Sequence, residues 1–166
     1  MYTVPQNYIM RFKHFLHASL LILVLLFMTA ESFGQDNWWK EKKYKTESKK
    51  QKFALCKASF MTIGDGFLYS NVFNITPYIS DEVFISIMSD DKGYYNQEQG
   101  RYILEQFMAN SPVASFRWKN SSVNENYSFA VGKYKYRRNG YVSTSTISVS
   151  LKYINDTWII DQIIIN

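Results

Sequence analysis

YSFAVGKYKYRRNGYVSTSTISVSLKY, residues 127–153, is the stretch that decides the fold of this chain. Asn139 and Gly140 stand near its middle, and both residue types adopt the positive φ angles that a two-residue type I′ turn requires. The stretch is therefore expected to form a β-hairpin with strands at Tyr127–Arg138 and Tyr141–Tyr153. In the second strand apolar residues alternate with polar ones, so one face should meet a core and the other should meet water.

Three further stretches have the composition of strands. Ala114–Val123 and Thr157–Ile165 flank the hairpin and are separated from it by turn residues. Earlier in the chain, Glu82–Ser89 alternates between two sets of side chains in the way a strand does. The Asp90–Gly93 segment that follows it is rich in turn-forming residues and is expected to form a turn.

Helices are expected mainly before these strands. Phe53–Ile63 carries apolar residues at helical spacing, and a Gly-Asp-Gly break separates it from a short second helix over Phe67–Phe73. Asn96–Asn110 is the clearest helix, because Asn96 is a good N-cap residue and Gln99 occupies the reciprocal position of a capping box. Helices followed by a run of strands predict an α+β domain in which N-terminal helices pack on a curved antiparallel sheet.

Residues 1–34 are expected to be a signal peptide. A cationic start precedes the apolar run FLHASLLILVLLFM, whose length is typical of a signal and short for a membrane span. Small side chains favour cleavage after Gly34, with cleavage after Ala30 as the alternative, and a start at Met10 is left open. The protein is thus predicted to be exported, periplasmic or secreted, and to meet the membrane only through this segment before cleavage.

Residues 35–52 are expected to be a basic flexible leader, and residues 53–166 a single α+β domain. The leader has seven lysines against three acidic residues, whereas the ten basic and ten acidic residues of the domain balance. A domain that binds nucleic acid carries a clear basic excess on a folded face, so no nucleic-acid partner is expected. The leader leaves open adhesion to a membrane or polysaccharide surface.

The residues expected in the exported protein exclude most common catalytic and metal sites. Both histidines, His14 and His17, lie in the expected signal peptide, and Cys56 is the only cysteine. Without histidine there is no imidazole base, and one cysteine can form neither a zinc site nor an internal disulfide. No metal site, cofactor or catalytic residue is therefore expected, and Cys56 is expected to be buried and inert.

Spaced apolar and aromatic residues along the domain form a pattern that resembles known proteins. They are Tyr95, Ile103–Phe107, Asn110–Pro112, Phe116, Tyr127–Gly132 and Trp158–Ile163. The order of elements resembles the nuclear-transport-factor-like (cystatin-like) cone, in which a curved sheet wraps around helices. More closely, the chain resembles a family of exported Bacteroidetes proteins known as a domain of unknown function. The resemblance implies a small secreted or periplasmic domain with a pocket and no assigned catalytic residues, and it leaves a homodimer open.

Four residues are candidates for a binding site in such a pocket: Trp118, Tyr134, Tyr136 and Asp161. The three aromatic side chains could line an apolar cavity, or they could be ordinary sheet aromatics. Asp161 is expected to share a strand face with Ile159, Ile163 and Ile165, where an apolar setting would raise its pKa and let it act as a general base. The alternative is a carboxylate near the sheet margin paired with an arginine or tyrosine.

These observations favour a non-catalytic exported domain that binds a small ligand or another envelope protein. The absence of histidine and of any catalytic motif supports this hypothesis over an enzyme. Two alternatives stay open. One is an enzyme that uses carboxylate and tyrosine acid–base chemistry centred on Asp161, and the other is a surface-adhesion module that acts through the lysine-rich leader.

Overall fold

The computed structural model of the chain describes residues 38–40, 46–88 and 91–166. The expected signal peptide and its cleavage sites lie outside these residues. Within the described part of the chain, no helix is both long enough and apolar enough to cross a membrane. The described residues belong to one compact unit.

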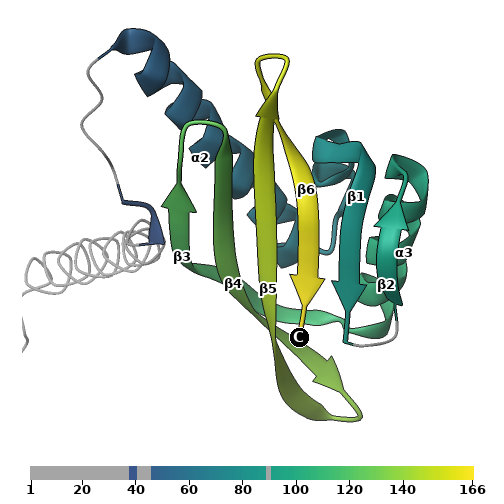
Figure 1. Ribbon diagram of the computed structural model, residues 1–166. Coiled ribbons are helices and arrows are strands. Elements are labelled where there is room, and N and C mark those ends of the chain that lie inside the picture. Colours follow the sequence, from purple (N-terminus) through teal and green to yellow (C-terminus); the bar gives the residue numbers. More distant parts are fainter. Residues whose placement is uncertain (1–37, 41–45, 89–90) are drawn as a thin grey trace, which may run out of the picture. The chain divides into compact units, whose positions relative to one another are not determined.

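Six strands form one sheet in the order β2-β1-β6-β5-β4-β3 (Figure 1). Their bounds are β1 Ile79–Ile87, β2 Asp91–Tyr95, β3 Val113–Val123, β4 Tyr127–Arg138, β5 Tyr141–Ile154 and β6 Thr157–Ile165. All neighbours run antiparallel except β1 and β6, which are parallel. The expected antiparallel sheet is therefore a mixed one, because no tight turn joins β1 to β6 and forces them to run in opposite directions. The turn expected at residues 90–93 is also wrong, since β2 begins at Asp91 and pairs with β1.

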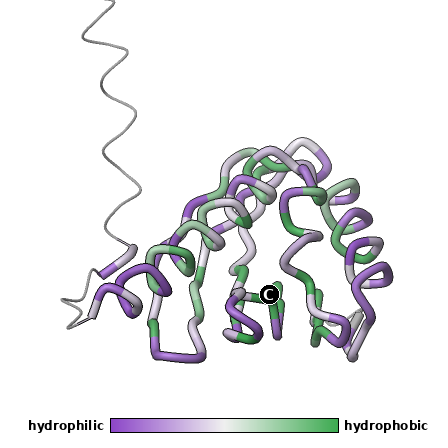
Figure 2. The backbone as a smooth tube through the Cα atoms, turned by 90° about the horizontal axis from the view of Figure 1, so that it is seen from above, coloured by the Kyte–Doolittle hydropathy of each residue, from purple (hydrophilic) through white to green (hydrophobic). Residues whose placement is uncertain are grey.

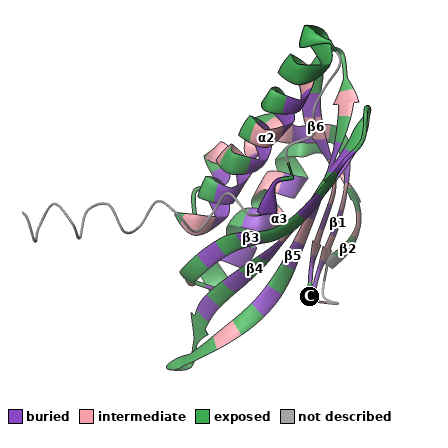
Figure 3. Cartoon of the chain, turned by 90° about the vertical axis from the view of Figure 1, so that its left-hand side faces the viewer, coloured by how far each residue is buried: buried purple, intermediate pink, exposed green. Residues whose placement is uncertain are grey.

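Two helices lie on the same face of this sheet (Figure 3). They are α2, Glu47–Leu68, and α3, Gln97–Asn110, and two 3-10 turns, η2 Val72–Asn74 and η3 Thr76–Tyr78, connect α2 to β1. The capping box predicted for α3 is confirmed: Gln99 N donates to Asn96 Oδ1 over 2.9 Å, and Asn96 N donates to Gln99 Oε1 over 3.1 Å. Because α2 begins at Glu47, it includes residues that were expected in the flexible leader.

The predicted β4–β5 hairpin is confirmed. Asn139 and Gly140 have φ angles of 51° and 81°, and Arg138 pairs with Tyr141, so two residues with positive φ make the turn. The turn between β5 and β6 has the same character, since its two residues have φ angles of 48° and 61°. Turn chemistry therefore sets the register of all three C-terminal strands.

Helix α2 continues through the Gly-Asp-Gly sequence where a break was expected. Gly64 and Gly66 are buried and face neighbouring side chains. A Cβ added at Gly64 would lie 2.6 Å from Trp118 Nε1, and one added at Gly66 would lie 2.5 Å from Ile75 Cγ1. These glycines allow close packing of the helix instead of ending it, so the separate second helix predicted over Phe67–Phe73 is wrong.

The domain also begins earlier than the predicted boundary at residue 53. Trp38 and Trp39 are only 4% and 8% exposed, and both rings lie about 6 Å from the ring of Phe60. The Ser121 hydroxyl donates a hydrogen bond to the Trp38 carbonyl over 2.7 Å. Burial of two indole rings removes a large apolar area from water, which explains why this part of the leader joins the fold.

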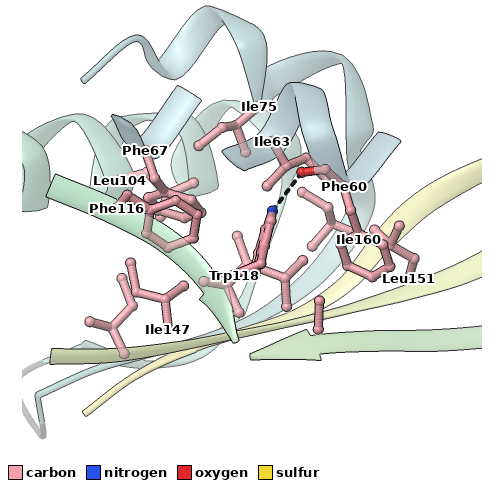
Figure 4. Close-up of a cluster of buried hydrophobic side chains, with 14 of the residues drawn as sticks. Phe60, Ile63, Phe67, Ile75, Leu104, Phe116, Trp118, Ile147, Leu151 and Ile160 are labelled. Carbon is pink, nitrogen blue, oxygen red and sulfur yellow. Dashed lines mark hydrogen bonds between the residues drawn. The ribbon is translucent and has the colours of Figure 1, made fainter. Parts of the chain in front are cut away.

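The core lies between the helices and the inner face of the sheet. Hydrophobic and hydrophilic stretches alternate along the described elements (Figure 2), and buried residues alternate with exposed ones along β3, β4 and β5 (Figure 3). Figure 4 shows side chains from α2, α3 and the sheet meeting in one cluster. Cys56 belongs to this core, so the prediction of a buried thiol is confirmed. Burial raises its pKa to about 12, which keeps the thiol protonated at neutral pH.

Replacing Gly132 by alanine should destabilise the protein. A Cβ at Gly132 would lie 2.5 Å from Phe116 Cζ and 3.1 Å from Trp118 Cε3, so two core rings would have to move. Overpacking of this kind lowers the free energy of unfolding by about 1–3 kcal/mol, which urea denaturation measures. Gly93→Ala in β2 is the matched control, because its Cβ would meet the nearest atom at an ordinary 3.5 Å. Equal stability of G132A and wild type would contradict the close packing.

Candidate functional site

Aromatic side chains from β3 and β4 cover part of the inner face of the sheet. In the register of these strands Phe116 lies opposite Tyr134, and Trp118 lies opposite Gly132. The Phe116 ring centroid is 4.8 Å from that of Trp118 and 6.4 Å from that of Tyr134. Because Gly132 has no side chain, the Phe116 and Trp118 rings occupy the space above it. This is the region where the sequence predicted a pocket.

Trp118 connects the sheet to helix α2. It is 2% exposed, and its indole N–H donates a hydrogen bond to the Phe60 carbonyl over 3.0 Å (Figure 4). The Phe60 ring packs against it at 5.6 Å in a T-shaped arrangement. A buried indole N–H needs an acceptor, and here the helix backbone provides it. Trp118 therefore acts as a packed core residue, and its polar atom is not available to a ligand.

Tyr134 and Tyr136 are also packed in the core. Tyr134 is fully buried, and its hydroxyl donates a hydrogen bond to the Ser111 carbonyl over 2.7 Å, just after α3 ends. Burial raises the pKa of Tyr134 to about 12, opposed by a weaker contribution from Ser70. Tyr136 is 6% exposed, and its ring lies 6.0 Å from the Tyr134 ring. The two tyrosines fill space on the inner face of β4.

Asp161 lies at an irregularity in β6. Leu151 of β5 pairs with Ile160, and the next residue, Ser150, pairs with Gln162, so Asp161 is the extra residue of a β-bulge. A bulge shifts the alternation of a strand by one position. The side chains before and after Asp161 therefore do not alternate with the regular period of two residues. The face of the sheet on which Asp161 lies was predicted from that period.

The expectation that Asp161 shares a face with Ile163 and Ile165 is wrong. Both isoleucines are fully buried, whereas the Asp161 side chain is 39% exposed and lies 3.5 Å from Lys152 Nζ. The alternative of a paired carboxylate outside the core fits, with a lysine in place of the expected arginine or tyrosine. A solvated ion pair of this type lacks the apolar setting that would make Asp161 a general base.

The core of the described residues carries little acid–base chemistry. Its buried residues of the polar and charged types are all serines: Ser59, Ser111, Ser121, Ser128, Ser145 and Ser150. Every buried side-chain nitrogen or oxygen in this part of the chain has a hydrogen-bond partner. The described residues also contain no cluster of three or more histidine, cysteine, aspartate or glutamate side chains that could hold a metal ion. Cys56 and the buried tyrosine Tyr134 keep their protons at neutral pH, because both have pKa values of about 12.

The surface of the described residues includes three shallow hollows. One, of about 570 Å³, is lined by residues between Tyr95 and Ile103 at the start of α3. The others, of about 310 Å³ and 300 Å³, lie beside η2 and between α2 and β6. None of the three is lined by Trp118, Tyr134, Tyr136 or Asp161. The four predicted site residues therefore do not share one of these hollows.

The sequence reasoning did not identify Lys133, Lys135 and Arg117 as members of a group of cations on the outer face of the sheet. Lys133, Lys135 and Arg137 are exposed and alternate along β4 with buried residues. Arg117 of β3 is also exposed and lies directly opposite Lys133. The spacing of two residues along β4 was visible in the sequence, but the position of Arg117 depends on a register between strands that the sequence does not specify.

The comparisons with known proteins agree with this fold. Residues 60–166 match the domain of unknown function DUF4783. The chain belongs to the DUF4783 family. A DUF4783 protein from Bacteroides uniformis has a similar structure, with a TM-score of 0.59 at 16% identity over 64% of this chain and 94% of that protein. No curated protein matches the chain.

Two solved structures from outside the DUF4783 family share the fold. A protein of the NTF2-like family from Streptomyces avermitilis gives a TM-score of 0.53 at 6% identity, over 70% of this chain and 96% of that one. A ketosteroid isomerase-like protein from Erwinia carotovora gives a TM-score of 0.57 at 8% identity. The match covers 69% of this chain and 95% of that protein. The predicted nuclear-transport-factor-like α+β fold is thus confirmed for this DUF4783 domain. At these identities the similarity concerns the fold alone.

The Tyr134 phenol should titrate well above the ordinary tyrosine pKa of 10. Because its pKa is about 12 in the folded protein, the folded state holds this proton more tightly than the unfolded state. The resulting stabilisation is complete below pH 10 and is lost as the pH rises through about 12. Ultraviolet difference spectra of wild type against Tyr134→Phe measure the titration. A Tyr134 transition near pH 10 in the folded protein would contradict the buried hydrogen bond.

Proposed function

We propose that this DUF4783 domain is a non-catalytic binding domain of an exported protein and that it contacts its partners through its outer surface. The observation that carries the proposal is the filled inner face. Trp118 and Tyr134 are buried there, and their polar atoms are bonded to the Phe60 and Ser111 carbonyls. A ligand pocket needs concave space with polar groups that are free to orient the ligand, and these side chains provide neither.

The enzyme alternative loses support from the position of Asp161. Its carboxylate lies outside the core beside Lys152, and the Cys56 thiol keeps its proton because its pKa is about 12. Acid–base catalysis near neutral pH needs a group whose pKa lies close to the working pH. The inner face of the described structure offers serine, tyrosine and cysteine side chains instead.

Adhesion through a flexible lysine leader is supported less well than contact through the folded surface. Lys49 forms an ion pair with Glu125 in the β3–β4 turn. Lys52 Nζ donates to Asn126 Oδ1 over 2.8 Å and lies 3.8 Å from the centre of the Tyr153 ring. These two lysines are held against the domain, so part of the leader's positive charge already has partners within the fold.

Export and the choice of partner remain part of the proposal. The apolar run in residues 15–28, followed by small residues near Gly34, supports secretion to the periplasm or beyond. In the periplasm or outside the cell, an envelope component is the expected partner. A second copy of the chain is an alternative partner, because the exposed faces of the sheet could pair.

Wild-type protein should not take up a small aromatic molecule in its core. Trp118→Ala removes an indole ring from the core and should leave a cavity that binds indole, because dry apolar cavities bind aromatic molecules of matching size. Thermal melts with added indole should therefore raise the melting temperature of W118A and leave that of the wild type unchanged.

Trp118→Ala lowers the free energy of unfolding by about 3–5 kcal/mol, which could prevent W118A from folding. Phe67→Ala, with benzene as the probe, is therefore the second variant. Phe67 is fully buried, which makes the two cavities comparable. A rise in the melting temperature of the wild type with indole or benzene would contradict the filled core and would favour the small-ligand version of the function.

The exported protein should begin at Gln35. Signal peptidase requires small side chains at the pocket-facing positions before the cut, which Ser32 and Gly34 provide. Intact mass spectrometry of the protein recovered after export should show the loss of residues 1–34. Gly34→Tyr is the control and should block this cut. A product that begins at Glu31 would show that cleavage follows Ala30, and an unprocessed product would contradict the signal peptide.

A further inference from the structure

We infer that the outer face of β3 and β4, together with the projecting end of the β4–β5 hairpin, docks on an anionic phospholipid surface. The inference rests on the proposed function, because it identifies the outer contact surface and the chemistry of its partner. It concerns two groups of residues. The hairpin cations are Arg117, Lys133, Lys135, Arg137 and Arg138, and the apolar tip is Tyr141 and Val142.

The hairpin extends past its neighbours in the sheet (Figure 1). Pairing of β3 with β4 reaches Tyr136, and pairing of β6 with β5 reaches Ile147, so the residues between them pair mainly with each other. The end of the hairpin is therefore free on both sides to meet a surface.

The hairpin cations are all exposed, and none forms an ion pair or a side-chain hydrogen bond with another described residue. Successive outward side chains on a strand are about 7 Å apart, so Lys133, Lys135 and Arg137 form a row. Arg117 stands directly opposite Lys133, a pairing of like charges that is unfavourable in the free protein. Elsewhere on the described surface Arg101 and Lys152 have carboxylate partners. An anionic partner would relieve the repulsion within the row.

The charges of the chain are divided between two parts of the domain. Residues 113–138, which form β3 and β4, contain six basic residues and one acidic residue. Residues 79–110, which form β1, β2 and α3, contain two basic and six acidic residues. A charge-neutral domain with this division is attracted most strongly to an anionic surface when β3 and β4 face it.

The apolar tip favours a lipid surface over an acidic polysaccharide. Tyr141 and Val142 are 78% and 62% exposed, next to Arg138 and Arg137 in the register of the hairpin. Tyrosine is favoured at the interface between lipid headgroups and hydrocarbon, and an exposed valine gains there by leaving water. A sugar polymer offers anions to the cations but no hydrocarbon to the valine.

Protection of a sheet edge does not explain the hairpin cations on β4. Charged side chains on an edge strand prevent unwanted strand pairing, and Arg117 and Lys119 of β3 fit that role. Lys133 and Lys135 lie on β4, which has a neighbour on each side. Their charge is therefore not needed to protect an edge.

Vesicle co-sedimentation of the exported protein tests the inference. Wild type should bind vesicles of phosphatidylcholine mixed with phosphatidylglycerol and should not bind phosphatidylcholine alone. Lys133→Gln with Lys135→Gln should weaken binding about 25-fold, since each cation near such a surface contributes about fivefold. Tyr141→Ser with Val142→Ser should weaken it about tenfold at unchanged charge. Added salt should weaken binding of the wild type.

Two matched controls accompany these variants. Lys152→Gln removes a cation that is paired with Asp161, and Tyr94→Ser removes a tyrosine that is 69% exposed on β2. Neither should change binding. Because all variants share one N-terminus and change exposed residues, differences between them report on the hairpin, and equal urea midpoints confirm that they fold.

Three results would overturn the inference. The first is that wild type does not bind anionic vesicles, and the second is that the hairpin variants and the controls lose vesicle binding equally. The third is that the protein binds dextran sulfate and the tip substitutions do not change this binding. That third result would assign the surface to a polysaccharide. The proposed function fails separately, by uptake of indole into the wild-type core. Failure of the vesicle experiment alone therefore removes only the lipid surface.

Discussion

The structure depends on the contact between Trp118 and helix α2. The indole N–H donates to the Phe60 carbonyl, and two glycines make room for the ring, Gly64 on the helix and Gly132 on the neighbouring strand. A Cβ at Gly64 would lie 2.6 Å from the indole nitrogen, so the helix approaches the sheet only because that side chain is absent. Together with the hydrogen bond from the Trp158 indole N–H to the Lys52 carbonyl, this contact sets the distance between α2 and the sheet. The Trp118 ring also occupies the space that a pocket would need.

Local features of the fold could be predicted because neighbouring residues decide them. The turn at Asn139 and Gly140 needs two positive φ angles, and the α3 capping box needs only Asn96 and Gln99. Features that depend on residues far apart in the chain could not be predicted. Gly64 was interpreted as a helix break because its partner, Trp118, lies 54 positions later in the sequence. The parallel pairing of β1 with β6 is of the same kind.

For the candidate site too, the sequence predicted local features but not those that depend on residues far apart in the chain. Alternation along β4 indicated that Tyr134 and Tyr136 share a face, but whether such side chains line a cavity or fill it depends on the volume left by the opposing helices. Asp161 was wrongly assigned to the apolar face of β6, because the pattern of apolar residues in the sequence does not reveal a β-bulge. The row of lysines on β4 was readable from spacing alone, whereas its extension to Arg117 required the register with β3.

The filled inner face and the uneven distribution of charge on the outer surface both favour the proposal that this domain contacts its partners through its outer surface. The ketosteroid isomerase-like protein shares the fold at 8% identity, so the fold by itself does not decide how its inner face is used. Among the described residues the inner face holds aromatic rings with satisfied polar atoms, and unpaired positive charge is concentrated on β3 and β4. Under the proposed function, stability and recognition are separated onto opposite faces of the same strands. A substitution at Lys135 can then alter recognition at little cost in folding, while a substitution at Tyr134 or Tyr136 beside it acts mainly on the core.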